Sequence, residues 1–298
     1  MATIAPKYLY DALGSRLFSA ITELPEYYPT RTEAAIFSRE MKGMADALGP
    51  VATLVDLGAG NCEKAARLFE TFRVQRYVAV DISVNYLRDS LACLQREHPE
   101  MDMLGVGLDF SAALALPAEI GEGPRTLFYP GSSIGNFSPA EACAFLGRLA
   151  GQMDASGGLL IGVDLIKEKS LLDAAYDDAL GVTAAFNRNL LRHVNARLDA
   201  DFDIGDWQHV AFFNEAAARI EMHLEARRDL DAGWPDEAGR RIRRFAAGER
   251  IHTENSYKYS PDGFSTLLTK AGFADIRMWT DPRGWFALFF ARQGSTRT

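Results

Sequence analysis

Short runs rich in aliphatic and β-branched residues alternate with helical patterns from residue 51 to residue 163. Parallel strands produce such an alternation, because each connection between them needs a crossover, which is usually a helix. The pattern therefore predicts an α/β fold with a parallel sheet, whose ligands bind at the carboxyl ends of the strands. The predicted strands are 51–57, 76–82, 101–108, 125–131 and 157–165.

The segments around these strands have the periodicities that complete such a sheet. We predict crossover helices at 61–73, 84–97 and 139–153, and a further helix at 261–273. Two apolar segments follow near the C-terminus, and we expect them to form an antiparallel pair that closes the sheet. These last strands are "ADIRMWTD" and "GWFALFFAR".

Two blocks fall outside this rhythm, the first residues of the chain and a long insertion after the fifth strand. The insertion has a helical stretch at 170–198 and then alternating segments at 209–214 and 219–230. We predict that both blocks form one α+β substrate-binding domain at the carboxyl ends of the strands. The predicted domains are 1–30 with 168–258, and 31–167 with 259–298.

Charge and composition limit the partners of the chain. The net charge is −8 and the pI about 5.2, so no overall field attracts nucleic acid, and we expect a small-molecule substrate instead. The basic cluster Arg240 to Arg244 lies among acidic neighbours and is typical of a solvated face. We expect the chain to act as a monomer.

The sequence favours a cytoplasmic protein without a metal site. No apolar run approaches the ~20 residues that span a bilayer, and the N-terminus lacks the order of a secretory signal. The three cysteines match no paired-ligand pattern, and the five histidines show no HxxxH or HxH spacing. We therefore expect no membrane association, no disulfides and no metal.

A glycine turn between the first strand and its helix predicts a cofactor loop. In "VDLGAGNCEK", residues 55–64, Gly58 and Gly60 begin a dinucleotide-like motif, but Glu63 occupies the place of its third glycine. A carboxylate at a helix N-terminus suits the helix dipole but opposes a pyrophosphate there. The loop therefore favours a nucleoside cofactor without phosphates.

Acidic residues follow the next two strands. Asp81 ends the second strand, where it can accept hydrogen bonds from ribose hydroxyls, and Asp109 follows the third, beside Phe110, a partner for an adenine ring. Each acid taken alone is more typical of a turn, but together with the glycine loop they indicate S-adenosylmethionine. The expected fold is thus a Rossmann-like class I S-adenosylmethionine-dependent methyltransferase sheet with an inserted α+β domain.

The fourth strand ends in "PGSSIGNFSP", residues 130–139, where amine methyltransferases often have an Asn or Asp followed by an aromatic residue. An amine that accepts a methyl group must point its lone pair at the sulfonium methyl, so an acceptor oxygen should hold its N–H groups. Asn136 is suited to this role. A turn-stabilising role for Asn136 stays open from this segment alone.

The stretch "LPEYYPTRTEAA", residues 24–35, has two interpretations. Pro29 fixes the chain, Thr30 can cap a helix and Glu33 can complete a capping box, in which case Tyr27 and Tyr28 cover the core. Alternatively, one of the two phenols faces a ligand pocket.

Long strings of the sequence resemble the histidine Nα-methyltransferase family, whose members make trimethylhistidine (hercynine) on the route to ergothioneine. The similarity spans about residues 7 to 292. The strings are "PKYLYDALGSRLFSAITELPEYYPTRTE", "GSSIGNFSP", "DLIKEKSLLDAAYDDALGVTAAFNRN", "RIEMHLEAR", "HTENSYKYSP" and "WTDPRGWFAL".

The resemblance implies a role for individual residues. Tyr27 and Tyr176 would hold the substrate carboxylate, Asn136 would contact the amino acid backbone, and Tyr10 would lie near the amine, where we expect it to relay the proton. Phe18, Gly131 and Met222 would shape the pocket, although an aromatic residue and a methionine are usually core. The implied cofactor positions are Gly58, Lys64, Asp81, Asp109 and Phe110, of which Lys64 otherwise resembles a solvated helix residue.

Substrate choice would depend on Glu254 and Ser256, because the resemblance assigns the imidazole ring to them. In an extended segment residues i and i+2 share a face, which leaves Asn255 and Tyr257 pointing away. Without the resemblance, this segment is typical of a polar edge strand. The implied reaction is three methyl transfers from S-adenosylmethionine to the amine of L-histidine.

Other functions fit the sequence less well. The nearest alternative is an Nα-methyltransferase for another free amino acid such as tryptophan, which Glu254 and Ser256 disfavour. A nucleic-acid amine methyltransferase is disfavoured by the acidic charge, and an NAD oxidoreductase by Glu63. A silent cofactor-binding regulator would not need the tyrosines, Asn136 and Glu254 together.

The glycine loop has Ala, Asn and Cys where relatives commonly have Ser, Thr and Ser, so cofactor affinity can differ.

Overall fold

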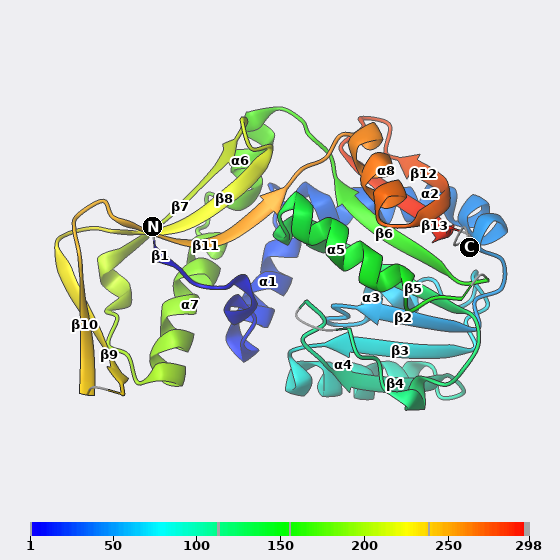
Figure 1. Cartoon of the computed structure of the whole chain (residues 1–298), viewed down its shortest axis with the longest axis horizontal. Helices are drawn as coiled ribbons and strands as arrows, with labels where there is room; N and C mark the ends of the chain where they lie inside the picture. Colours follow the sequence, from blue (N-terminus) through cyan, green and yellow to red (C-terminus); the bar gives the residue numbers. More distant parts are fainter. Residues whose placement is uncertain (1, 112–113, 155, 238, 295–298) are drawn as a thin grey trace. The chain divides into compact units, whose positions relative to one another are not determined.

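The computed structural model describes residues 2–111, 114–154, 156–237 and 239–294. The chain divides into two compact units, each built from two segments (Figure 1). We call Met1–Tyr28 with Lys167–Tyr257 the inserted unit, and Pro29–Ile166 with Lys258–Thr298 the sheet unit. These boundaries lie within two residues of the domain boundaries expected from the sequence.

The sheet unit contains a seven-stranded sheet in the order β12-β13-β6-β5-β2-β3-β4. The five adjacent strands from β6 to β4 run parallel, and β12 and β13, orange to red in Figure 1, add an antiparallel pair at the other edge. The predicted α/β fold is confirmed, with strand ends displaced by at most two residues. The strands are β2 Thr53–Leu57, β3 Arg76–Asp81, β4 Asp102–Gly107, β5 Arg125–Tyr129, β6 Gly158–Asp164, β12 Phe273–Thr280 and β13 Phe286–Gln293.

Alternate residues of the strands supply two apolar cores, one on each face of the sheet. Leu127 of β5 belongs to the core that contains Phe145 of α5, whereas its neighbour Phe128 belongs to the core that contains Ile36 of α2. This is the pattern of a sheet covered on both faces, since successive side chains of a strand point to opposite sides. The helices are α2 Tyr28–Leu48, α3 Glu63–Ala66, α4 Val84–Glu97, α5 Pro139–Ala150 and α8 Pro261–Lys270.

The helix predicted at 61–73 is much shorter in the structure. Only Glu63–Ala66 is helical, and hydrogen-bonded turns continue to Arg73, whose φ is 52°. Leu68 and Phe72 produced the helical periodicity, yet both are buried within these turns. Burial of the same apolar face therefore does not require a continuous helix here.

The inserted unit contains a four-stranded sheet in the order β1-β11-β8-β7 and a separate hairpin of β9 and β10. The stretch predicted as one helix at 170–198 is two helices, because Gly181 adopts a left-handed φ of 74° and the Asp178 carboxylate accepts hydrogen bonds at the start of the second helix. The elements are β1 Ala2–Thr3, α1 Ala12–Thr22, α6 Lys169–Tyr176, α7 Val182–Leu198, β7 Trp207–Asn214, β8 Arg219–Ala226, β9 Leu230–Asp236, β10 Gly239–Phe245 and β11 Arg250–Tyr257.

Four arginines of the basic cluster lie on β10, a strand that the sequence did not predict, and each pairs with an acidic side chain. These ion pairs neutralise the local positive charge, as expected of a solvated face. The pairs are Arg240–Asp201, Arg241–Asp236, Arg243–Glu249 and Arg244–Asp229. Short 3₁₀ helices lie at Pro6–Leu9, Ala118–Ile120, Ser133–Asn136 and Ile204–Asp206.

Every described helix is too short or too polar to cross a bilayer.

Candidate active site

The glycine loop after β2 is held by the carboxylate of Asp81 at the end of β3. Gly58 and Gly60 have φ values of 77° and 55°, a region that L side chains rarely adopt. The N–H of Gly60 donates to Asp81 Oδ2 at 3.0 Å, and the N–H of Ser83 donates to Oδ1 at 2.8 Å. Asp81 thus joins two loops, and an ionised carboxylate has further lone pairs for a ribose.

Phe110 lies against the same loop. A Cβ atom added to Gly58 would be 3.7 Å from the Phe110 ring, which also packs edge-on against Tyr129 at 5.9 Å between centroids. The neighbouring Asp109 accepts a hydrogen bond from Ser111 Oγ. The structure therefore brings together Gly58 and Phe110, which are 52 positions apart in the chain, at the carboxyl end of the sheet.

Lys64 and Glu33 form an ion pair that the sequence did not predict. Lys64 Nζ lies 2.6 Å from Glu33 Oε2, and the other carboxylate oxygen accepts the N–H of Gly131 at 2.8 Å. The predicted capping box is wrong, because α2 begins at Tyr28, which places Thr30 inside the helix and leaves the buried Glu33 carboxylate to these partners.

The loop after β5 has two consecutive left-handed residues. Gly131 and Ser132 have φ values of 74° and 60°, and the Ser132 hydroxyl accepts the N–H of Asp164 at 2.9 Å. The half-buried Asn136 ends the short helix that follows. Asp164 also forms a fully buried ion pair with Lys258 at 2.7 Å. Gly131, predicted to shape the pocket, and Asn136, predicted to contact the acceptor amine, thus lie on a loop fixed by buried polar groups.

In the inserted unit, the predicted aromatic pocket residues form one cluster. Centroid distances are 5.8 Å from Tyr10 to Phe18, 6.1 Å from Phe18 to Tyr27 and 6.2 Å from Tyr27 to Tyr176. Phe186 of α7 completes it, at 5.6 Å from Tyr10 and 6.1 Å from Phe18. Sequence reasoning missed Phe186, because an aromatic residue inside an amphipathic helix is typical of a core.

A β-bulge sets the direction of the predicted specificity residues. The pairing of β11 with β8 shifts between His252 and Glu254, so Thr253 is the extra residue and Glu254 lies opposite Met222. Ser256 accepts a hydrogen bond from the hydroxyl of Tyr176 at 2.8 Å. Glu254 and Ser256 are 6% and 4% exposed, which is unlike a polar edge strand.

Tyr176 is also held through its backbone by a buried histidine. His209 Nε2 lies 2.8 Å from the carbonyl oxygen of Tyr176, and Nδ1 lies 2.9 Å from the side-chain nitrogen of Asn187. The same Asn187 nitrogen donates to the carbonyl of His223 at 2.9 Å. Burial lowers the pKa of His209, so the ring is neutral, and these partners assign the proton to Nε2.

Tyr28 is not merely a packing residue. Its hydroxyl lies 2.7 Å from Lys167 Nζ, which stands 4.5 Å from the centroid of the Tyr28 ring. Tyr27, by contrast, joins the aromatic cluster. The two adjacent phenols therefore have different neighbours.

A buried carboxyl lies on β2 just before the glycine loop. Tyr77 Oη donates to Asp56 Oδ2 at 2.8 Å. Burial raises the pKa of Asp56 to about 7 and the pKa of the neighbouring Cys62 thiol to about 12. The thiol therefore stays protonated and unreactive near neutral pH, whereas Asp56 titrates there.

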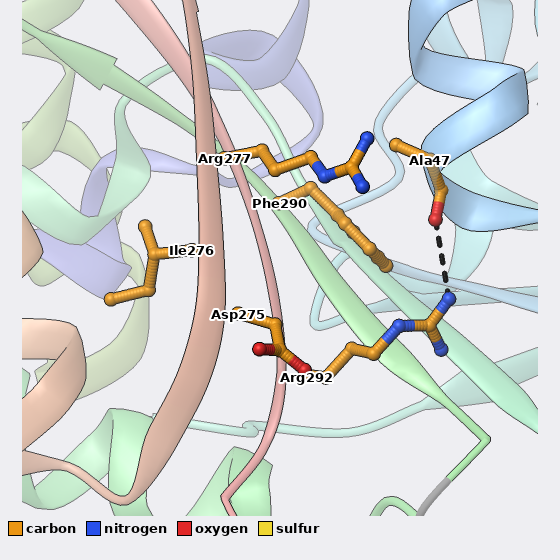
Figure 2. Close-up of a pocket in the computed structure, with 6 residues that line it drawn as sticks. All are labelled: Ala47, Asp275, Ile276, Arg277, Phe290 and Arg292. Atoms are coloured by element: carbon orange, nitrogen blue, oxygen red, sulfur yellow. Dashed lines mark hydrogen bonds between the residues drawn. The ribbon is translucent and has the colours of Figure 1, made fainter.

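One surface pocket lies away from these residues (Figure 2). Phe290 and Arg292 of β13 line it, and Arg292 reaches the carbonyl of Ala47 at 3.2 Å. Because β13 runs antiparallel to β6 and Ala291 pairs with Leu159, the pocket is near the amino end of the parallel strands. Ligands of such sheets bind at the opposite end. Within the described ranges, no group of three acidic, histidine or cysteine side chains is arranged for a metal ion.

The sheet, with its glycine loop and acidic strand ends, defines a class I S-adenosylmethionine-dependent methyltransferase. The model of the SAM-dependent, histidine-specific methyltransferase family matches residues 1–293, and the chain belongs to this family. Histidine N-alpha-methyltransferase of Mycolicibacterium smegmatis is 40% identical over 302 positions, covering 97% of this chain and 90% of that protein.

Two further similarities are more distant. Ergothioneine biosynthesis protein 1 of Neurospora crassa is 31% identical over 281 positions, which cover 91% of this chain and 31% of that protein. The crystal structure of the PH0226 protein from Pyrococcus horikoshii OT3 has a TM-score of 0.52 at 13% identity, covering 93% of this chain and 97% of that one. This structural similarity concerns the fold alone.

Proposed function

We propose that this enzyme methylates the α-amine of L-histidine three times. The product is hercynine, and the reaction is the first step of ergothioneine biosynthesis. The hydrogen bond from Tyr176 to Ser256, beside buried Glu254, carries this proposal. It unites a residue expected at the substrate carboxylate with one expected at the imidazole. An enzyme for tryptophan is not favoured, because the matching family is histidine-specific.

The sheet unit has the features that an S-adenosylmethionine site needs. Gly58 presents no side chain toward Phe110, Asp81 offers a carboxylate for the ribose and Lys64 offers a cation for the methionine carboxylate. Asp109 is assigned to the adenine. The bound cofactor supplies an electrophilic methyl group on a sulfonium.

The acceptor amine has to lose a proton before each transfer. A deficit of about two pK units corresponds to ~2.7 kcal/mol, which burial beside a sulfonium can supply by lowering the pKa of the ammonium. A strong base is then unnecessary. Asn136 orients the N–H groups, and the Tyr10 hydroxyl passes the proton to water.

The aromatic cluster suits the growing positive head of the product. Each methyl transfer enlarges the amine and ends in a quaternary ammonium, which aromatic faces attract through cation–π interactions. Tyr10, Phe18 and Tyr27 supply such rings, with Phe186 behind them. Gly131 and Met222 are the other residues that the proposal assigns to the substrate.

Specificity follows from buried polar groups. Glu254 accepts the imidazole N–H and Ser256 serves the other ring nitrogen, so an analogue without these groups loses both hydrogen bonds. A site of this kind rejects such analogues by ~10⁴-fold or more.

The test is incubation of the purified protein with S-adenosylmethionine and each amino acid separately, with products identified by mass. Mono-, di- and trimethylhistidine should form, and no methylated tryptophan or leucine. Methylation of another amino acid in preference to histidine would refute the proposal. Light scattering under the same conditions tests the expected monomer.

A further inference from the structure

Glu33 is a buried carboxylate with two partners on separate segments of the sheet unit. Its side chain is 1% exposed, although it lies on α2 only six residues after Tyr27. Oε2 receives Lys64 from the start of α3, and Oε1 receives the N–H of Gly131 from the loop after β5. A buried charge persists only when it is paired and hydrogen-bonded, and Glu33 meets both conditions.

The strand beneath leaves room for this carboxylate. A Cβ atom added to Gly162 of β6 would lie 2.2 Å from Glu33 Oε1 and 3.1 Å from the N–H nitrogen of Gly131. Any side chain at position 162 would therefore displace the carboxylate. The buried position of the Glu33 carboxylate therefore depends on the absence of a side chain at Gly162.

We propose that Glu33 is a positioning residue that fixes the cofactor lysine and the acceptor loop relative to each other. Lys64 is the cation assigned to the methionine carboxylate, and Gly131 belongs to the loop that carries Asn136. One rigid carboxylate holds both, so the donor methyl group and the acceptor amine keep the same relative position through three successive transfers. This inference rests on the proposed function.

The physical argument is one of geometry. Methyl transfer requires the nucleophile and the leaving sulfur in line, and a misplacement of about 1 Å can cost ~10²-fold in rate. Lys64 has a flexible four-carbon stem, and its side chain is 34% exposed. Without Glu33 its ammonium group would sample many positions, and the Gly131 N–H would lose its acceptor.

Two variants disturb this arrangement in different ways. Glu33→Gln keeps an oxygen for Gly131 but presents an amide instead of a charge to Lys64. Gly162→Ala changes no polar group but displaces the Glu33 carboxylate. Glu40→Gln, on the same helix, removes an exposed carboxylate that pairs with Arg39 and serves as the control.

The experiment measures kcat and KM for histidine, together with the affinity and stoichiometry of S-adenosylhomocysteine binding by calorimetry. We expect both variants to lower kcat about 10- to 100-fold per binding-competent site, with one ligand still bound per chain, and the control to match the wild type. Unchanged kcat per competent site would overturn the proposal, even if the stoichiometry or the melting temperature fell, because that result marks a structural role alone.

The binding arm separates this inference from the proposed function. If the wild type does not methylate histidine, the proposed function fails, while the effect of Glu33→Gln on S-adenosylhomocysteine affinity still reports on Lys64. If both variants bound S-adenosylhomocysteine with unchanged affinity, Glu33 would not hold Lys64 in place for the cofactor.

Discussion

The hydroxyl of Tyr176, the last residue of α6, donates a hydrogen bond of 2.8 Å to the hydroxyl of Ser256 on β11. The two side chains are 80 positions apart and act as one polar unit. A hydroxyl that accepts a hydrogen bond retains its own hydrogen for donation. Ser256 can therefore present that hydrogen to a ring nitrogen in the direction that Tyr176 sets.

A double-mutant cycle tests this unit. Tyr176→Phe and Ser256→Ala should each raise the KM for histidine about tenfold, and the double variant should lose about 1 kcal/mol less than the sum of the single changes, because both remove the same hydrogen bond. Steady-state kinetics measure all four proteins. Strictly additive losses would show that the two hydroxyls act independently.

Glu254→Ala should reduce the preference for histidine over tryptophan by ~10²-fold or more, because the imidazole N–H loses its acceptor and the site gains volume. Competition between the two amino acids, with products separated by mass, measures the preference. Glu225→Gln, on the adjacent strand and paired with Arg250, is the matched control. A variant that still selects histidine as the wild type does would refute the assignment of Glu254.

Phe18→Leu should shift products toward mono- and dimethylhistidine, because the quaternary head loses an aromatic face worth about 1 kcal/mol. The distribution of products at limiting time shows the effect directly. An unaltered distribution would remove Phe18 from the proposed cation site. Phe212→Leu on β7, outside the aromatic cluster, provides a comparison.

Two substitutions of His209 separate its two hydrogen bonds. The side-chain nitrogen of Gln can replace Nε2 as donor to the Tyr176 carbonyl, whereas Asn can replace only Nδ1 as acceptor from Asn187. We therefore expect His209→Gln to retain a KM for histidine within a few-fold of the wild type, and His209→Asn to raise it about tenfold. Equal KM values in the two variants would argue against a role for the carbonyl bond.

Asp56 makes stability depend on pH. Burial raises the folded pKa to about 7 from 3.8, so between these values the folded chain keeps a proton that the unfolded chain has lost. The free energy of unfolding should accordingly decrease as pH rises from about 4 to about 7, by at most about 1.4 kcal/mol per pH unit, and then level off.

Asp56→Asn imitates the protonated form and keeps an acceptor for Tyr77. Denaturant titrations at several pH values should show a flatter profile for this variant over the same range. A decline of equal slope in both proteins would assign the effect to other groups.

The sheet was predictable because its evidence is local. Each strand from β2 to β6 is a short apolar run. Asp81 and Asp109 could be identified because they lie at or just after the ends of predicted strands. The antiparallel pair β12 and β13 was equally evident from its sequence. The short α3 was missed because turns and helices bury Leu68 and Phe72 equally well.

The polar contacts were not predictable from periodicity. Glu33 has the spacing of a capping box, yet its partners Lys64 and Gly131 are 31 and 98 positions away. The two-residue periodicity of a strand does not reveal the β-bulge at Thr253, although the bulge determines which residue lies opposite Met222. Phe186 and His209 likewise acquire their roles only through distant partners.

The first strand has a consequence for biosynthesis. Ala2 and Thr3 of β1 pair in parallel with Ile251 and His252 of β11. β1 is therefore synthesised long before its partner strand β11, and contacts of such long sequence separation slow folding. Truncation anywhere between β1 and β11 would leave β1 without its partner strand, so proteases should cleave such incomplete chains at β1 more readily than the full chain.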